Sequence, residues 1–243
     1  MAPTSFFLKM ITIGGPQNEH TVNIFRREKA PALSKLKFIF VIVGFLAMKG
    51  FSQATARIDS LTVAALRAED AGNFKTAIKI HEEIMALDPK AAESAVSIAG
   101  LYGKLKEFDQ EIAWANKAIK IDSANSSAYV NLGNGFAGKG DLARAKRYYE
   151  HAEILDPDSP FPPYSMGVIE ESKGNFSAAK KYYERAVARD STFENGYFNL
   201  AAMCATLKEF QDAKRYILKA LELDPNAEDA KEMLRHIKKD LGE

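Results

Sequence analysis

The stretch Asn73–Pro89, with the sequence NFKTAIKIHEEIMALDP, decides the fold because its pattern returns four more times along the chain. The copies begin 34 residues apart, and the later ones run over residues 107–123, 141–157, 175–191 and 209–225. A period of roughly 20 to 50 residues is typical of a solenoid, in which each unit buries its apolar face only by stacking on its neighbours. The spacing therefore predicts a solenoid before any single residue is considered.

The repeated unit predicts two helices that cross closely. Five units align without insertion over residues 58–91, 92–125, 126–159, 160–193 and 194–227. The eighth position is small in every unit, as two helices require where they approach each other, and the seventeenth position is large and apolar. These residues are Ala65, Ala99, Gly133, Gly167 and Ala201 at the eighth position, and Phe74, Phe108, Leu142, Phe176 and Phe210 at the seventeenth. The twentieth and twenty-seventh positions share one face of the second helix, are mostly Ala, and are predicted to pack inward.

Each unit also predicts two turns. The thirty-first position is Asp in all five units, and Pro follows it at Pro89, Pro157 and Pro225. Because Pro forces the preceding residue out of helical geometry and costs about 3 kcal/mol inside a helix, the second helix should end there. Between the two helices, three units carry a glycine that suits a tight turn. These glycines are Gly72, Gly140 and Gly174.

With these features the chain resembles the tetratricopeptide repeat family, whose unit is a pair of antiparallel helices with small residues at the eighth and twentieth positions and Pro near the end. The third unit follows this pattern throughout, from YVNLGNGF at Tyr129–Phe136 to Asp156 and Pro157. The resemblance covers residues 58–227 and implies an all-α solenoid, a right-handed superhelix of five helix-turn-helix repeats. Several residues depart from the pattern: Glu111 replaces Ala, Glu170 stands where a core aromatic is usual, and the aromatic of the fourth position is replaced by Leu61, Ala95 and Pro163.

Residues 228–243 predict a capping helix. Apolar residues recur there at helical spacing, and basic residues lie on the opposite face. The apolar residues are Ala230, Met233, Leu234, Ile237 and Leu241. A solenoid needs such a helix to cover the apolar surface of its last repeat.

Charge is unevenly distributed along the chain. Residues 1–52 carry seven basic and two acidic side chains, whereas residues 53–243 carry 26 and 30. The repeat region is therefore mildly acidic and lacks the basic surface of a nucleic-acid-binding protein. Residues 1–33 show no helical periodicity and predict an unassigned, disordered lead.

Residues 34–56 predict a signal peptide or a short membrane anchor. Lysines precede the uncharged run Phe38–Met48 (FIFVIVGFLAM), and small residues follow it. The run is shorter than the about 20 residues that span a bilayer. The sequence therefore favours export to the periplasm or outside the cell, with cleavage after Ser52, Ala54 or Ala56. The alternative is an uncleaved anchor formed by residues 36–48, with the repeat domain outside the cytoplasm; the membrane would be contacted only through this segment.

The sequence shows no cluster of residues with the spacing of a catalytic or metal site. His81 and Cys204, which is the only cysteine, occupy positions that face the core in other repeats, so both are predicted to be packed core residues. Glu170 also falls at a core-facing position, where an acid must be paired or neutral. We expect it to reach water or a tyrosine hydroxyl or, alternatively, to act as a specificity residue. No enzyme activity, metal or cofactor is expected.

The family resemblance implies a concave groove lined by the second, fifth, sixth, ninth, twelfth and thirteenth positions of each unit. In this chain those positions include asparagine amides, which can both donate and accept hydrogen bonds to an extended backbone, and aromatic side chains. The candidate groove residues are Asn131, Asn134, Phe161, Tyr164, Ser165, Phe198 and Asn199. Such a groove suits a protein or peptide partner.

Two functions fit this sequence. The first is a non-catalytic adaptor that binds a protein or peptide in the groove. The second is a structural subunit of an envelope complex that assembles through its convex face or its ends. A row of aromatic residues on the second helices would serve the second function, although aromatic rows at repeat spacing more often pack between repeats. This row contains Trp114, Tyr148, Tyr182 and Tyr216.

Overall fold

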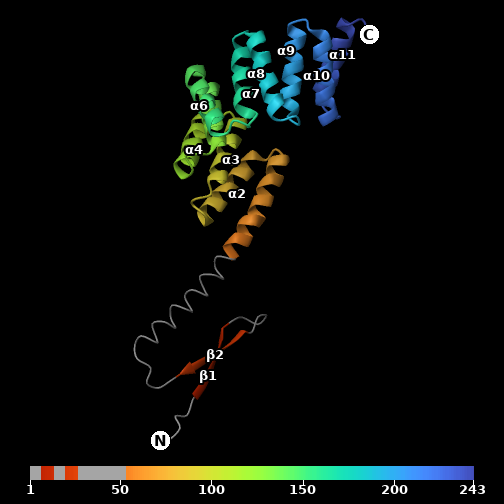
Figure 1. Cartoon of the computed structure of the whole chain (residues 1–243). Helices are drawn as coiled ribbons and strands as arrows, with labels where there is room; N and C mark the ends of the chain where they lie inside the picture. The colour runs from red at the N-terminus through yellow and green to blue at the C-terminus, as the bar shows by residue number, and fades with distance from the viewer. Residues whose placement is uncertain (1–6, 14–19, 27–52) are drawn as a thin grey trace. The chain divides into compact units, whose positions relative to one another are not determined.

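The computed structural model describes residues 7–13, 20–26 and 53–243, and the chain divides into two units, Met1–Arg57 and Ile58–Glu243. In the first unit, strands β1 (Phe7–Ile13) and β2 (His20–Arg26) form an antiparallel pair (Figure 1). Residues 7–13 and 20–26 thus form strands, whereas the sequence predicts a disordered lead over residues 1–33. Both strands are rich in β-branched and aromatic residues, which favour extended backbone. This preference does not produce a helical period, so the helical pattern of the repeats gives no sign of it.

The second unit is an all-α solenoid of consecutive antiparallel helices (Figure 1). Residues 53–70 are helical. The helices that follow are α2 (Phe74–Leu87), α3 (Ala92–Lys104), α4 (Phe108–Ile121), α5 (Ser126–Gly138), α6 (Leu142–Leu155), α7 (Phe161–Ser172), α8 (Phe176–Arg189), α9 (Glu194–Thr206), α10 (Phe210–Leu223) and α11 (Glu228–Asp240). Each helix packs on its sequence neighbours, and the first helices of successive repeats also meet, α3 with α5 and α5 with α7.

The repeated Asp ends the second helix of every unit. Its carboxylate accepts a hydrogen bond from the backbone N–H two residues later, at 2.8–3.2 Å. The pairs are Asp88 with Lys90, Asp122 with Ala124, Asp156 with Asp158, Asp190 with Thr192 and Asp224 with Asn226. This local bond competes with helix continuation, so the helix ends there even in the two repeats that lack the following Pro.

The turn between the two helices of a repeat uses left-handed backbone. Gly72, Gly140 and Gly174 adopt φ values of 70°, 81° and 76°. In the other two repeats Lys106 and Lys208 hold the same conformation, with φ values of 60° and 62°. Glycine takes this conformation without strain, whereas the two lysines are held in it by the packing of the flanking helices.

Small second-helix residues form the centre of the solenoid. The alanines of the twentieth and twenty-seventh positions are fully buried. They are Ala77, Ala118, Ala145, Ala152, Ala179, Ala186, Ala213 and Ala220. Because these side chains are small, the two helices of one repeat pack closely against each other and against the next repeat, as the sequence predicts.

Residue size is matched across the helix crossing within each repeat. Gly133 faces the buried ring of Tyr149, and a Cβ at Gly133 would lie 2.4 Å from Tyr149 Cε1. Gly167 faces Tyr183 in the same way, at 2.6 Å. The other three repeats have Ala at the eighth position and His81, Ala115 or Ile217 in place of the tyrosine. A larger side chain on one helix is therefore accommodated by a smaller one on the other.

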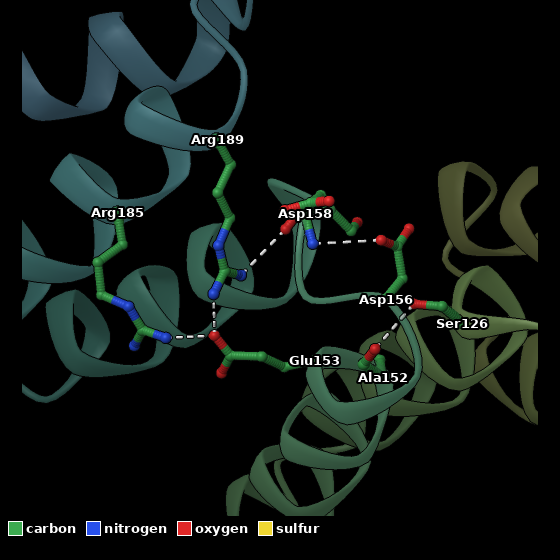
Figure 2. Close-up of polar contacts among 8 residues, drawn as sticks. Ser126, Ala152, Glu153, Asp156, Asp158, Arg185 and Arg189 are labelled. Carbon is green, nitrogen blue, oxygen red and sulfur yellow. Dashed lines mark hydrogen bonds and ion pairs between the residues drawn. The ribbon is translucent and has the colours of Figure 1, made fainter.

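An ion network joins the third and fourth repeats (Figure 2). Glu153 on α6 accepts hydrogen bonds from Arg185 and Arg189 on α8. Arg189 also donates through Nη1 to the Ser159 carbonyl, at 3.1 Å, in the loop that leads into α7. Because one carboxylate and one guanidinium each bind two groups, the network fixes α6, α8 and the start of α7 relative to one another.

The last helix, α11, covers the end of the solenoid, with Ala230 and Ile237 buried in the core cluster of the last repeats. In the described part of the chain, no helix combines the length and apolarity needed to cross a membrane. The predicted signal or anchor segment, residues 34–56, lies outside the described residues except for residues 53–56, which are helical.

Candidate functional site

A concavity of about 570 Å³ is formed by three successive repeats. Its walls come from α3, α4, α5 and the first residue of α7. The lining residues are Val96, Gly100, Gly103, Lys104, Phe108, Glu111, Ser127, Val130, Asn131, Asn134 and Phe161. All of them except Phe108 and Glu111, which come from α4, occupy the unit positions that are predicted to line the groove.

Glu111 places a carboxyl group in the wall of this concavity. The residue is 2% exposed, and among the described residues its Oε2 is the one buried side-chain oxygen or nitrogen without a hydrogen-bond partner. Gly103 on α3 provides the space, since a Cβ there would lie 2.6 Å from Glu111 Oε1. The carboxyl group therefore occupies the volume that a larger residue at position 103 would fill.

Burial raises the pKa of Glu111 to about 8, because the charged form loses hydration and gains no compensating partner. Lys104 lines the same concavity, but its Nζ lies over the Phe74 ring, 5.2 Å from the ring centre. Tyr149 also interacts with Glu111: burial, and to a smaller extent the Glu111 charge, raise the pKa of Tyr149. At neutral pH the Glu111 carboxyl is therefore mostly protonated.

Two of the predicted groove asparagines lie in this concavity. Asn131 Nδ2 donates to the Val96 carbonyl at 2.9 Å, and Asn134 Oδ1 accepts from the Tyr149 hydroxyl at 2.8 Å. Each amide therefore uses one polar atom to join helices within the solenoid. Part of the hydrogen-bonding capacity that the sequence assigns to a ligand is therefore used inside the protein.

Phe161 is the most exposed apolar residue of the concavity. Its ring is 49% exposed and packs edge-on against Phe193, with the ring centres 5.6 Å apart. It opens α7 and is followed by Pro162 and Pro163, which are both buried. Proline is tolerated in the first helical turn because that turn has no partner for its N–H groups, so the two prolines fix the start of α7 and with it Phe161.

Three other predicted residues make contacts between repeats outside the concavity. Asn199 Nδ2 donates to the Tyr164 hydroxyl at 3.0 Å, which joins α9 to α7. Burial raises the pKa of Tyr164, which packs edge-on against Phe193 at 5.0 Å. Ser165 interacts with the Tyr149 hydroxyl of the preceding repeat. These polar groups therefore stabilise the stacking of the repeats.

Phe198 lies in a different, smaller depression of about 350 Å³ between α9 and α11. Acidic residues surround it, and these are Glu194, Glu228 and Asp229. The seven candidate residues thus do not form one continuous site. Asn131, Asn134 and Phe161 share the main concavity, and the others lie elsewhere along the first helices.

The aromatic row on the second helices is half-buried in the solenoid. Trp114 and Tyr148 pack against a buried cluster between the second and third repeats. Cations cover three of the rings: Lys117 lies 4.0 Å from the ring centre of Trp114, and Arg185 and Arg215 lie over Tyr182 and Tyr216. These contacts agree with a packing role for the row.

Glu170 is paired, as the sequence predicts for an acid at its position. Its carboxylate accepts hydrogen bonds from Asn175 Nδ2 at 2.8 Å and Lys173 Nζ at 3.0 Å, and these bonds hold the pKa of Glu170 below its ordinary value. Its partners are thus residues of the following turn and not a tyrosine. Glu170 is also not among the residues that line the concavity.

His81 and Cys204 are core residues, as predicted. His81 is 6% exposed and lies between Glu69 Oε1, at 3.2 Å, and Ser94 Oγ, at 3.4 Å. Cys204 is fully buried, and burial raises the pKa of its thiol to about 11. Within the described residues, no group of three or more acidic, His or Cys side chains has the arrangement of a metal site.

Sequence reasoning selected Glu170 as the unusual acid and treated Glu111 only as a departure from the repeat pattern. The signal for Glu111 was present in the sequence. A Glu stands in a column of Ala, and the same repeat has Gly103 at the twelfth position, one of the groove positions. The larger side chain of Glu111 fills the space that Gly103 leaves open, and this match is visible only where the two helices cross.

Comparison with known sequences points to one family. Sequence profiles described as tetratricopeptide repeat match residues 92–125, 126–159, 164–193 and 194–227. Together they cover more than half of the 243 residues.

Individual relatives agree with this match. SEC of Arabidopsis thaliana, a probable UDP-N-acetylglucosamine–peptide N-acetylglucosaminyltransferase, is 32% identical over 78 residues, which are 32% of this chain but only 8% of that protein. A thermophilic TPR protein of Thermus thermophilus, TTC0263, superposes with a TM-score of 0.66 at 17% identity, over 74% of this chain and 98% of that chain. A chain of the APC/C hetero-tetramer Cut9–Hcn1 gives 0.65 at 16% identity, over 74% and 36%. These two likenesses concern the fold.

Proposed function

Because the chain belongs to the tetratricopeptide repeat family, we propose that it is a non-catalytic adaptor that binds a protein or peptide in its concave groove. The observation that carries the proposal is the concavity formed by α3, α4, α5 and α7. Val96, Val130 and Phe161 provide apolar wall, and Asn131 and Asn134 provide amide groups. Apolar anchors combined with amides are suited to an extended or helical peptide.

The comparisons support binding more than catalysis. The similar chain in Cut9–Hcn1 belongs to a hetero-tetramer, so a solenoid of this kind can serve assembly with another protein. The match to the transferase covers 8% of that enzyme, so its activity is not carried over to this chain. The structural-subunit alternative has less support, because its aromatic row is engaged in packing and cation contacts.

Phe161→Ser is expected to reduce capture of the physiological partner by at least about tenfold, because it removes the exposed aromatic anchor of the concavity. The measurement is quantitative mass spectrometry of proteins retained from cell extract by the immobilised full chain. Ile154→Ser on α6 is the matched control, since Ile154 is 74% exposed and does not line the concavity. If both variants retain the same proteins as the wild type, the groove is not the binding surface. Loss with Ile154→Ser alone would favour the structural-subunit alternative.

We further propose that the protein is exported. The support is the lysine-flanked apolar run Phe38–Met48 followed by small residues. N-terminal sequencing of the protein from fractionated cells is expected to show a chain that begins at residue 53, 55 or 57, in the periplasmic or secreted fraction. An intact N-terminus in the membrane fraction would instead support the anchor formed by residues 36–48, and an intact N-terminus in the cytoplasm would refute export.

A further inference from the structure

We propose that the concavity receives a lysine side chain of the bound peptide, and that Glu111 supplies the carboxylate that pairs with its ammonium group. This inference rests on the proposed peptide-binding function and adds the chemistry of one partner side chain. It concerns a residue at which the second repeat departs from the other four, which have Ala at this position.

The first argument is the incomplete bonding of Glu111. Its Oε2 is buried and has no hydrogen-bond partner, although the residue lies in the lining of the concavity. A buried polar atom without a hydrogen-bond partner destabilises the folded state. The folded protein has therefore already accepted the cost of removing this carboxyl group from water, and a ligand that supplies a donor would recover part of that cost.

The concavity beside Glu111 has the shape and polarity that a lysine side chain needs. Gly100 and Gly103 leave space along α3, and Val96, Val130 and Phe161 give the concavity an apolar wall. A lysine has an aliphatic stem that apolar walls can bury and a charged end that a carboxylate can bind. One unpartnered oxygen suits the point charge of an ammonium group better than the two-pronged guanidinium of arginine.

The side chains of Lys104 and Tyr149, which lie near Glu111, are engaged with other residues. From α3, Lys104 is the cation of the lining, and its Nζ lies over Phe74. From α6, Tyr149 gives its hydroxyl hydrogen to Asn134 on α5. Among the residues that the structure describes, no cation pairs with the Glu111 carboxyl, which leaves that place to a cation of the ligand.

Lysine binding should be linked to proton release. The pKa of Glu111 is about 8, so the carboxylate fraction is about 0.1 at pH 7 and about 0.9 at pH 9, whereas a lysine ammonium stays mostly protonated up to about pH 10. The ammonium pairs with the carboxylate form, so binding at pH 7 should release a proton. The affinity should rise about tenfold from pH 7 to pH 9.

The test uses the full chain and two probe peptides, acetyl-Gly-Ala-Lys-Ala-Gly-amide and the same peptide with norleucine in place of lysine. Titration calorimetry in buffers of different ionisation enthalpy measures both affinity and proton release. We expect the lysine peptide to bind at least about tenfold more tightly than the norleucine peptide, and we expect this preference to grow with pH. Infrared spectroscopy should show loss of the protonated carboxyl band when the lysine peptide binds.

Glu111→Gln keeps the size of the side chain and should abolish the lysine preference, the proton release and the infrared change. Glu150→Gln on α6, which removes an exposed carboxylate outside the concavity, should leave the preference in place. Equal affinity for the two peptides, no binding of either, or a preference that survives Glu111→Gln would overturn the inference. Loss of partner capture in Phe161→Ser is measured independently, so the groove proposal can stand when the lysine inference fails.

Discussion

Raising the pH from about 4.5 to about 8 is expected to lower the free energy of unfolding of the repeats by up to about 1.4 kcal/mol per pH unit. The pKa of Glu111 is about 8 in the folded chain and about 4.5 when the carboxyl is solvated. Between these values the folded state holds a proton that the unfolded state has released, so a higher pH favours unfolding. Below about pH 4.5 and above about pH 8, Glu111 has the same charge in both states and does not change the free energy of unfolding with pH. Urea unfolding followed by circular dichroism at a series of pH values measures the effect.

The control for this prediction is Glu111→Gln, whose amide does not titrate. Its free energy of unfolding should lack this decline, so the difference between wild type and variant isolates Glu111 from other groups that titrate in the same range. Glu150→Gln on α6 is a second control, because Glu150 is exposed and should leave the decline unchanged. Parallel pH profiles of the wild type and Glu111→Gln would show that the carboxyl is hydrated in the folded protein and would contradict the burial described here.

The repeats could be predicted from the sequence because they are set by local and periodic signals. The repeated Asp ends each helix through a bond to a backbone N–H two residues away, and the small alanines recur on one helical face. Such signals do not depend on the rest of the fold. The sequence did not predict the β1–β2 hairpin, because its β-branched and aromatic residues have no counterpart in the helical period.

The candidate site was predicted only in part, because its chemistry depends on contacts between helices. Family positions placed Asn131, Asn134 and Phe161 in one groove. They could not show that Asn199 is bonded to Tyr164 in the neighbouring repeat, nor that Glu111 is enclosed beside Gly103. Both depend on which side chains meet across a crossing, and no single repeat contains that information.

Gly133→Ala is expected to lower the free energy of unfolding by up to about 2 kcal/mol, although alanine favours helix more than glycine does. The new Cβ would lie 2.4 Å from Tyr149 Cε1, and the ring is buried with its hydroxyl bonded to Asn134. Overpacking of a core costs about 1–3 kcal/mol, whereas the gain in helix propensity is about 1 kcal/mol. The steric cost should therefore exceed the gain in helix propensity. Urea unfolding of the full chain measures the change.

The same substitution should be tolerated when the facing residue is reduced in size. The fifth repeat already combines Ala201 with Ile217, and both are fully buried. Gly133→Ala in a Tyr149→Ile background is therefore expected to be neutral or stabilising, which gives a coupling energy of about 1–3 kcal/mol in the double-mutant cycle. Additive effects of the two substitutions would show that the helices of the third repeat shift apart freely. In that case the match of residue size across the crossing would not control how closely the two helices pack.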